Sequence, residues 1–267
     1  MRTGSDPSPD RDLLAVAEEA VGAGVDWLAE AGDEWSKRRF KASGEEVTDA
    51  DVEVEARVSR VLRERAPGIP VVGEESVGGG PLPSRCWLLD PIDGTMNFTR
   101  AAPLHTVSLA LVEGGRPTLG VVHAPALGRR WSVGPADGVP GPPPEPPGVR
   151  ELSRAVVGIT GAGSSGSRSG RFLASLLDGA YRVRMHGCMS LDLVGVAEGW
   201  LDACVCLAPE PWDVAAGVAL LRRRGLTALG ADGRDFTLGS PFLAAGRRDL
   251  AGALLDLWRS RPAGDGR

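Results

Sequence analysis

The sequence lacks a long apolar run, an excess of basic charge and a CxxC pair of cysteines. No stretch approaches the roughly 18 uninterrupted apolar residues typical of a membrane span, and the N-terminus has no apolar core of signal-peptide length. The 35 acidic and 30 basic residues give a net charge of -5. Nucleic-acid and membrane-surface binders need a basic footprint, so we expect neither kind of partner. From the missing apolar segments we expect a cytoplasmic protein.

Cysteine usage points to the same compartment. The four cysteines form no CxxC pair, and none of the three histidines stands at zinc-finger spacing from them; they are Cys86, Cys188, Cys204 and Cys206. Free, buried thiols in a reducing compartment are therefore the favoured interpretation. With 267 residues the chain suits one large domain or two small ones, and it is long enough to bury a sizeable core.

The first half mixes helices with strands. Apolar residues recur at helical spacing over residues 10–32, and Thr48 is placed to cap a second helix that ends before Pro67. "IPVVGEES" and "CWLLD" are typical of short buried strands. Residues 104–125 alternate, turn at Gly114 and Gly115 and alternate again, which predicts a β-hairpin.

The second half alternates strand and helix, which favours a layered α/β arrangement. Between the halves, residues 134–149 are too rich in proline and glycine for regular structure. We predict an N-terminal α+β part over residues 1–134, a connecting loop over 135–149 and a C-terminal α/β part over 150–267.

Carboxylates follow apolar, strand-like runs at three places. Glu74 and Glu75 end "VVGEES", Asp90 and Asp93 lie in "WLLDPIDGT", and Asp213 begins a helix in "PEPWDVAAG". Carboxylates gathered at element ends repel one another unless a cation lies among them. Oxygen ligands without His or Cys favour Mg²⁺ or Mn²⁺ over zinc or copper.

The "DPID" spacing suits such a site. Pro91 fixes its own φ and biases Asp90 toward an extended conformation, so we expect a sharp turn that aims Asp90, the Ile92 carbonyl and Asp93 into one pocket. Gly94 then permits a tight turn that brings Thr95 and nearby amides to a phosphate. Taken singly, each motif could be an ordinary turn or helix cap. Together and in this order, they favour two-cation phosphoryl chemistry.

The motifs "GEES", "WLLDPIDGTMNF" and "PWDVAAG" resemble those of the inositol monophosphatase family of lithium-sensitive, magnesium-dependent sugar phosphatases. The resemblance runs from the first predicted helix to the last. It implies an αβαβα layered fold, a homodimer, and hydrolysis of small phosphomonoesters with two or three Mg²⁺ per site and no covalent phosphoenzyme.

The resemblance also implies a metal-ligand set. Glu74 would bind one ion and serve another through water, and Asp90 would bridge two ions. The Ile92 carbonyl would complete the first, while Asp93 and Asp213 would hold the second.

Further roles follow from the same resemblance. Glu74 and Thr95 would orient the attacking water, and Asp51, in "EEVTDAD", would hydrogen-bond Thr95 and help deprotonate that water. The amides of Gly94 and Thr95 would hold the phosphate. Lys41 corresponds to a family lysine, at a spacing one residue shorter.

The chain departs from the family where the substrate is recognised. Cys206 stands where inositol-preferring members carry a Glu, and a thiol cannot replace a carboxylate at a diol. Glu210 could substitute for it from four residues away. Asp192 either touches the substrate or supports the start of its helix. Residues 160–170 either contact the substrate or form a flexible loop, and residues 131–151 replace a Gly-rich family hairpin.

The leading hypothesis is a Mg²⁺-dependent phosphatase acting on inositol monophosphate or a related cyclitol or sugar phosphate. The alternatives keep the reaction and change the substrate to a 3′-phosphonucleotide, histidinol phosphate or a specialised aminocyclitol or sugar phosphate. A non-catalytic binding scaffold is a third hypothesis, which loss of a metal ligand would favour; none is lost.

Overall fold

The computed structural model describes residues 9–32, 35, 37–40, 46–76, 80–135, 147–161 and 168–260. Lys41, residues 136–146 of the proline-rich segment and residues 162–167 lie outside the described residues. The predicted division into two parts at residues 135–149 therefore stays a prediction.

Two helices form the first layer, α1 (Pro9–Glu30) and α2 (Asp49–Arg65). Thr48 caps α2 as predicted: its hydroxyl accepts from the Asp51 amide, and the Asp51 carboxylate accepts from the Thr48 amide. This reciprocal capping box satisfies two amides that a helix start leaves without partners. It also fixes the Asp51 side chain.

The second layer is a five-stranded sheet in the order β3-β4-β5-β6-β7. The strands are β3 (Val71–Gly73), β4 (Arg85–Asp93), β5 (Thr106–Glu113), β6 (Arg116–Ala124) and β7 (Arg129–Val133). β3 runs parallel to β4, and the other neighbours are antiparallel. The predicted hairpin is β5–β6, and both turn glycines, Gly114 and Gly115, have positive φ.

The second half builds the remaining layers. Its sheet has the order β11-β12-β10-β8-β9. The strands are β8 (Val156–Thr160), β9 (Arg182–Arg184), β10 (Ala203–Leu207), β11 (Thr227–Gly230) and β12 (Phe242–Gly246). The helices are α4 (Arg168–Gly179), α5 (Met189–Glu198), α6 (Pro211–Arg223) and α7 (Arg248–Arg259).

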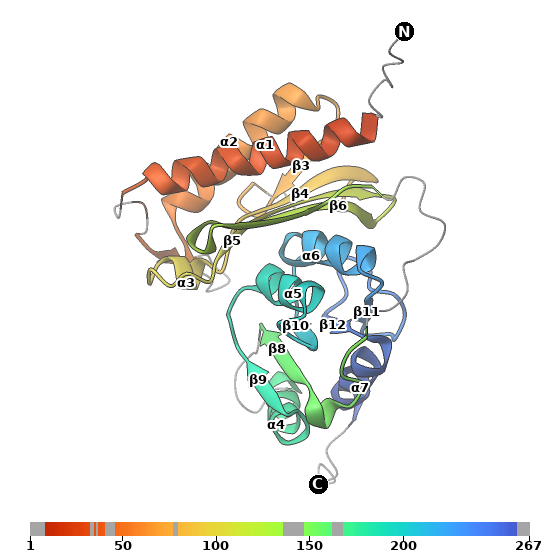
Figure 1. Ribbon diagram of the computed structural model, residues 1–267. Helices are drawn as coiled ribbons and strands as arrows, with labels where there is room; N and C mark the ends of the chain where they lie inside the picture. Colours follow the sequence, from red (N-terminus) through yellow and green to blue (C-terminus); the bar gives the residue numbers. More distant parts are fainter. Residues whose placement is uncertain are drawn as a thin grey trace.

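Five layers result, as Figure 1 shows: α1 and α2, the first sheet, α5 and α6, the second sheet, and then α4 and α7. Each of the four interfaces between layers has its own apolar cluster. In β4, for example, Trp87 and Leu89 face α1 and α2, whereas Cys86 and Leu88 face α5 and α6. The predicted αβαβα fold is confirmed.

One local prediction is wrong. The chain makes no sharp turn at Pro91; β4 continues through Asp93, and its register with β5 shifts between Asp90 and Asp93. Proline lacks an amide proton, so the irregular stretch accommodates it where a regular ladder would not. The bend comes at Gly94 instead, with φ of 90°, immediately before the short helix α3 (Thr95–Phe98).

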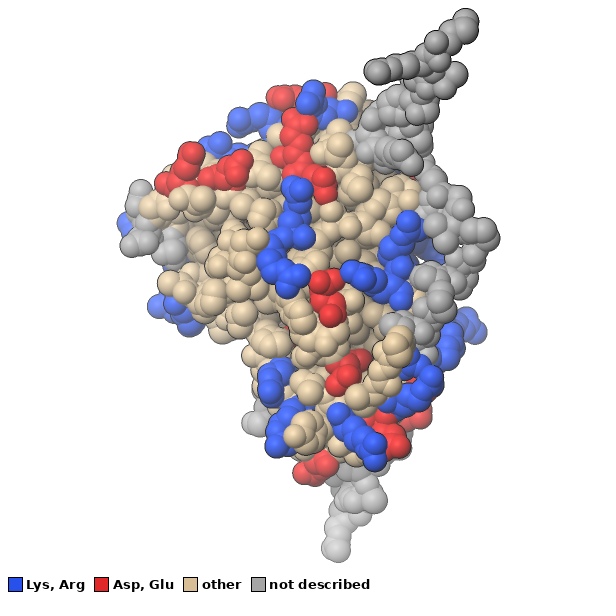
Figure 2. Space-filling view, in the orientation of Figure 1, with Lys and Arg blue, Asp and Glu red and all other residues tan. Residues whose placement is uncertain are grey.

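Several other short elements were not predicted from the sequence. β7 was not predicted, nor was the two-stranded ladder of β1 (Arg39–Phe40) and β2 (Glu46–Val47). No helix among the described residues is long and apolar enough to span a bilayer. On the face in Figure 2, basic and acidic side chains are interspersed.

Candidate active site

Two of the three predicted acidic motifs lie at the ends of adjacent strands. β3 and β4 are parallel, with Gly73 opposite Leu89, and the Glu74 amide donates to the Leu89 carbonyl at 3.1 Å. Glu74 therefore follows β3 beside the point where β4 reaches Asp90. This register places two of the three acidic motifs next to each other.

The third motif arrives on α6, which packs against the first sheet. Asp213 lies in the first turn of that helix, where its Oδ2 accepts from the Glu210 amide at 2.9 Å. Its pKa is raised well above the ordinary range by burial first, and then by the charges of Asp93 and Glu74. These interactions place Asp213 near the acids of the first sheet; Glu74, Asp90, Asp93 and Asp213 are called the carboxylate cluster below.

Asp90 is a deeply buried member of the carboxylate cluster. It is 2% exposed, and its Oδ1 is buried without a hydrogen-bond partner. Burial raises its pKa well above the ordinary range, and the charges of Glu74, Asp93, Asp213 and Asp51 raise it further. A buried carboxylate oxygen without a partner among other carboxylates fits a cation, because a positive charge both satisfies the oxygen and offsets the repulsion.

The carboxylate cluster does not form a complete metal site in this conformation. Among the described residues, no three His, Cys, Asp or Glu side chains converge closely enough to enclose an ion. Asp93 and Asp213 instead accept hydrogen bonds from backbone amides. Hydrogen bonds to a carboxylate favour its charged form, so these amides offset part of the repulsion among the carboxylates.

Asp93 joins the first sheet to the start of α5. Its Oδ1 accepts from the Met189 amide at 3.1 Å, and its Oδ2 accepts from the Ser190 amide at 2.6 Å and from Cys188 Sγ at 3.2 Å. Burial raises the pKa of Asp93, and the hydrogen bonds from Ser190, Cys188 and Met189 oppose that rise. The start of α5 is thus tied to a predicted metal ligand.

Gly94 and Thr95 form the turn predicted to hold phosphate. A Cβ at Gly94 would lie 2.9 Å from the Leu104 carbonyl oxygen and 3.2 Å from that of Gly187, so only glycine fits there. Thr95 Oγ1 lies 3.2 Å from Asp51 Oδ1 and 3.0 Å from the Ile92 carbonyl oxygen, and it can donate to either. The predicted contact between Asp51 and Thr95 is confirmed.

Asp51 is poised to accept that proton. Burial raises the pKa of Asp51 to about 6, while hydrogen bonds from Thr48 and Thr95 oppose the rise. At neutral pH the group is a carboxylate, so the arrangement can draw the Thr95 proton toward Asp51 and leave the hydroxyl oxygen free to accept from water.

Family comparison decides what this arrangement belongs to. Residues 10–262 match the family described as "Inositol monophosphatase family". The chain belongs to the inositol monophosphatase family. It is accordingly a phosphatase, a hydrolase of phosphoric monoesters.

Individual relatives agree with this assignment. An inositol-1-monophosphatase of Mycolicibacterium smegmatis is 35% identical over 268 residues, covering 96% of this chain and 95% of the relative. A histidinol-phosphatase of Mycobacterium tuberculosis is 38% identical, covering 77% and 85%. The solved inositol monophosphatase of Anabaena superimposes with a TM-score of 0.78 at 25% identity, covering 95% and 98%.

In this inositol monophosphatase family member, Cys206 and Asp192, the two positions weighed as substrate contacts, are both buried. Cys206 is fully buried in β10, in the apolar cluster facing α5 and α6, because both faces of that central strand are covered. Asp192 is also fully buried, and its two oxygens are bonded to Thr160 and His186. Asp192 thus supports its helix and the strand end, which was the alternative interpretation.

Two residues near the site were not foreseen from the sequence. Glu55 on α2 accepts from the Glu75 amide at 2.9 Å, and its carboxylate lies where a Cβ of Gly73 would be. Asn97 donates to the carbonyls of Leu104 and His186 at 2.7 and 2.8 Å. The glycine before Glu74 and the asparagine in "GTMNF" were the available signals, but neither identifies its partner.

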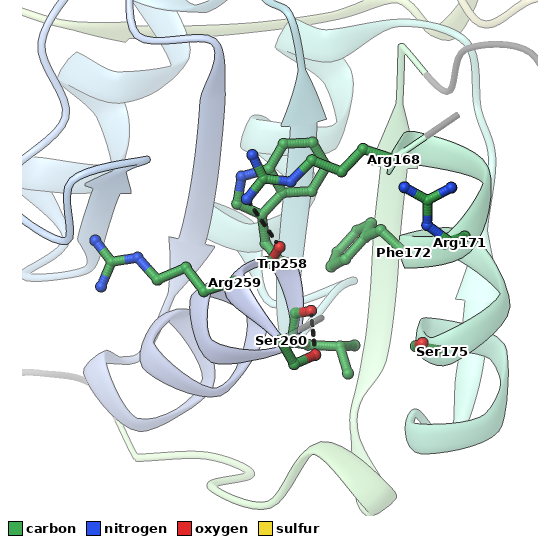
Figure 3. Close-up of a pocket in the computed structure, with 8 residues that line it drawn as sticks. Arg168, Arg171, Phe172, Ser175, Trp258, Arg259 and Ser260 are labelled. Carbon is green, nitrogen blue, oxygen red and sulfur yellow. Dashed lines mark hydrogen bonds between the residues drawn. The ribbon is translucent and has the colours of Figure 1, made fainter. Parts of the chain in front are cut away.

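A cavity of about 370 Å³ between α4 and α7 contains no member of the carboxylate cluster. In Figure 3 the guanidinium of Arg168 lies over the Trp258 ring, 4.0 Å from its centroid, and donates to the Trp258 carbonyl at 3.0 Å. Arg259 donates to the Ala231 carbonyl. Two of the cavity's arginines thus satisfy backbone carbonyls.

Proposed function

We propose that the chain hydrolyses inositol monophosphate, or a closely related cyclitol or sugar phosphate, with Mg²⁺ as cofactor. The observation that carries the proposal is the buried Asp90 oxygen without a partner among three further carboxylates at the ends of β3, β4 and α6. The relatives named inositol-1-monophosphatase support the substrate class.

Each residue has a role in this proposal. Glu74, Asp90, Asp93, Asp213 and the Ile92 carbonyl would hold two or three Mg²⁺, and Mn²⁺ has the same oxygen preference. When bound, the ions supply positive charge for the phosphate oxygens and activate water. The amides of Gly94 and Thr95 bind phosphate, while Glu74 and the Thr95 hydroxyl orient the attacking water. Asp51 accepts the proton that Thr95 passes on.

A panel assay tests the reaction and its substrate together. With Mg²⁺ present, inositol 1-phosphate should release phosphate faster than histidinol phosphate, a sugar phosphate or a 3′-phosphonucleotide. Asp93→Asn should lower the rate at least about 100-fold with an unchanged circular dichroism spectrum, because a metal ligand is lost. Asp256→Asn, at an exposed position on α7, is the matched control and should retain the rate. Release from no compound in the panel would refute the proposal.

Histidinol phosphate is the second candidate substrate. It is favoured by the 38% identity to a histidinol-phosphatase and by Cys206 at the position where the family resemblance implies a carboxylate. A higher kcat/KM for histidinol phosphate than for inositol 1-phosphate would select it.

We further propose a homodimer, inhibition by lithium and a cytoplasmic location. Exposed apolar residues on α4 and beside β9, at one edge of the second sheet, support a subunit interface; they are Leu177, Tyr181 and Met185. All four cysteines are free and buried, which suits a reducing compartment. Lithium sensitivity follows from the family resemblance.

A further inference from the structure

A buried hydrogen-bond chain links three segments beside the proposed site. The Asp192 side chain, on α5, is 0% exposed. Its Oδ2 accepts from the hydroxyl of Thr160, at the end of β8, at 2.6 Å, and its Oδ1 accepts from His186 Nδ1 at 2.6 Å. His186 lies in the segment between β9 and α5, with 28% of its side chain exposed.

The segment that carries His186 contacts the phosphate turn directly. The His186 carbonyl accepts from Asn97, on α3, at 2.8 Å. The Gly187 carbonyl oxygen would lie 3.2 Å from a Cβ at Gly94. A displacement of this segment would therefore reach the turn that is proposed to bind phosphate.

The same segment continues into the residues that hold Asp93. Cys188, Met189 and Ser190 all donate to the Asp93 carboxylate, and they immediately follow Gly187. Holding His186 in place therefore also holds the Gly94 turn and Asp93, a proposed metal ligand. Asp192 extends the connection to Thr160, at the end of β8.

The charges around His186 favour its protonated form. Asp192 faces it from α5 and raises the pKa of His186, while burial and Arg184, at the end of β9, oppose the rise. Its neighbours Thr160 on β8 and Asn97 on α3 are neutral. A fully buried carboxylate needs a cation or several donors, and the imidazolium supplies the cation. By contrast, burial lowers the pKa of His105 and of His123.

We propose that His186 is a positioning residue for the phosphatase reaction, an imidazolium that Asp192 clamps so that the Gly94 turn, Asp93 and the end of β8 keep one arrangement. The inference rests on the proposed function, because the turn and Asp93 matter through phosphate and Mg²⁺. It assigns a role to a histidine that touches neither the phosphate turn's amides nor the carboxylate cluster itself.

A histidine titration tests the clamp without turnover. The chain has only three histidines, His105, His123 and His186, so the imidazole NMR signals of the Mg²⁺-loaded protein can be assigned with single variants. We expect one signal to titrate above the ordinary histidine range near 6.5 and two below it. His186→Asn should remove the signal with the raised pKa. A His186 signal at or below the ordinary range would overturn the proposal even if no substrate is hydrolysed.

Kinetics test the positioning role. His186→Leu leaves a buried Asp192 oxygen without its donor and should raise KM about tenfold. His186→Asn keeps a neutral donor, so its KM should be elevated less and should not change with pH. The wild-type KM should rise toward that value as pH passes the His186 pKa. His123→Asn, on β6, is the matched control and should keep the wild-type profile.

A purely structural role would predict a different result. It would lower the stability of His186→Asn while leaving the pH dependence of KM as in the wild type. That result, together with wild-type rates of phosphate release, would reject the positioning role and leave the proposed phosphatase function intact. If the protein released no phosphate but the His186 pKa lay above the ordinary range, the proposed function would be rejected and the His186–Asp192 interaction would stand.

Discussion

At the scale of a single residue, Asp51 combines a proposed catalytic role with a cost to stability. Its folded pKa of about 6 lies above the ordinary 3.8, so the folded protein binds a proton more readily than the unfolded chain. The cost is absent below pH 4, grows as pH rises and is complete above about pH 6. Asp51→Asn should therefore stabilise the metal-free protein at pH 8 by about 1–3 kcal/mol, and this gain should vanish near pH 4.

Urea unfolding at the two pH values measures the Asp51 effect. The same variant should lose at least about tenfold in kcat, because an amide cannot draw the Thr95 proton as a carboxylate does. Asp49→Asn, two residues earlier and exposed, is paired with Arg39 and should give neither effect. A destabilised Asp51→Asn at pH 8 would contradict the expected burial cost.

At the scale of elements, the approach of α6 to the first sheet brings Asp213 to Asp90 and Asp93. Gly120 on β6 allows it: a Cβ there would lie 2.6 Å from the Ala216 carbonyl oxygen, on α6. Gly120→Ala should push the helix away, lower the free energy of unfolding by about 1–3 kcal/mol and raise the Mg²⁺ concentration needed for half-maximal activity.

Gly252→Ala provides the control for this helix-to-sheet contact. Gly252 lies in α7, and no atom lies within 4 Å of the position that an alanine methyl group would take there, so alanine should stabilise the helix by up to about 1 kcal/mol. Chemical unfolding and Mg²⁺ titration of activity would compare the two. Equal behaviour would show that the close approach is not what holds α6 in place.

Helices and strands followed from sequence wherever one element buries one regular face. The period of α1 is an example, and the capping residue Thr48 fixed the start of α2. The turn at Gly114 and Gly115 marked the β5–β6 hairpin, although these two strands are buried on both faces. β1, β2 and β7 were missed because strands this short show too little of a pattern alone and are identified by their pairing, β1 with β2 and β7 with β6. The Pro91 prediction failed for a related reason, since pairing with β5 carried β4 past the proline.

Some site residues could likewise be predicted from the sequence, and others could not. The acids of the motifs and the Asp51–Thr95 contact were predictable because they lie in short, distinctive strings. Glu55, Asn97 and the His186–Asp192 pair were not, because their roles depend on which segments the layers bring together. Cys206 was misplaced because sequence spacing does not reveal that both faces of β10 are covered.

At the scale of the whole molecule, the metal-free protein contains several buried acids whose pKa values are all raised. Asp51, Asp90, Asp93 and Asp213 each bind protons more readily folded than unfolded, so each loses stabilisation as pH rises through its folded pKa. With Mg²⁺ removed by EDTA, the melting temperature should therefore be lower at pH 8 than at pH 6, because Asp51, with a pKa of about 6, is still partly protonated at the lower pH.

Mg²⁺ should reverse this trend, because an ion that binds only the folded state stabilises it and offsets the repulsion among the ionised acids. At about 100 times its dissociation constant the gain is about 2.7 kcal/mol, or about 5–10 °C in a protein of this size. The shift should be larger at pH 8 than at pH 6, and Asp90→Asn should shrink it while raising the metal-free melting temperature at pH 8. A melting temperature unaffected by Mg²⁺ at both pH values would mean that the carboxylate cluster repels without binding. The ligand assignment would then fail even if the fold and the family remain.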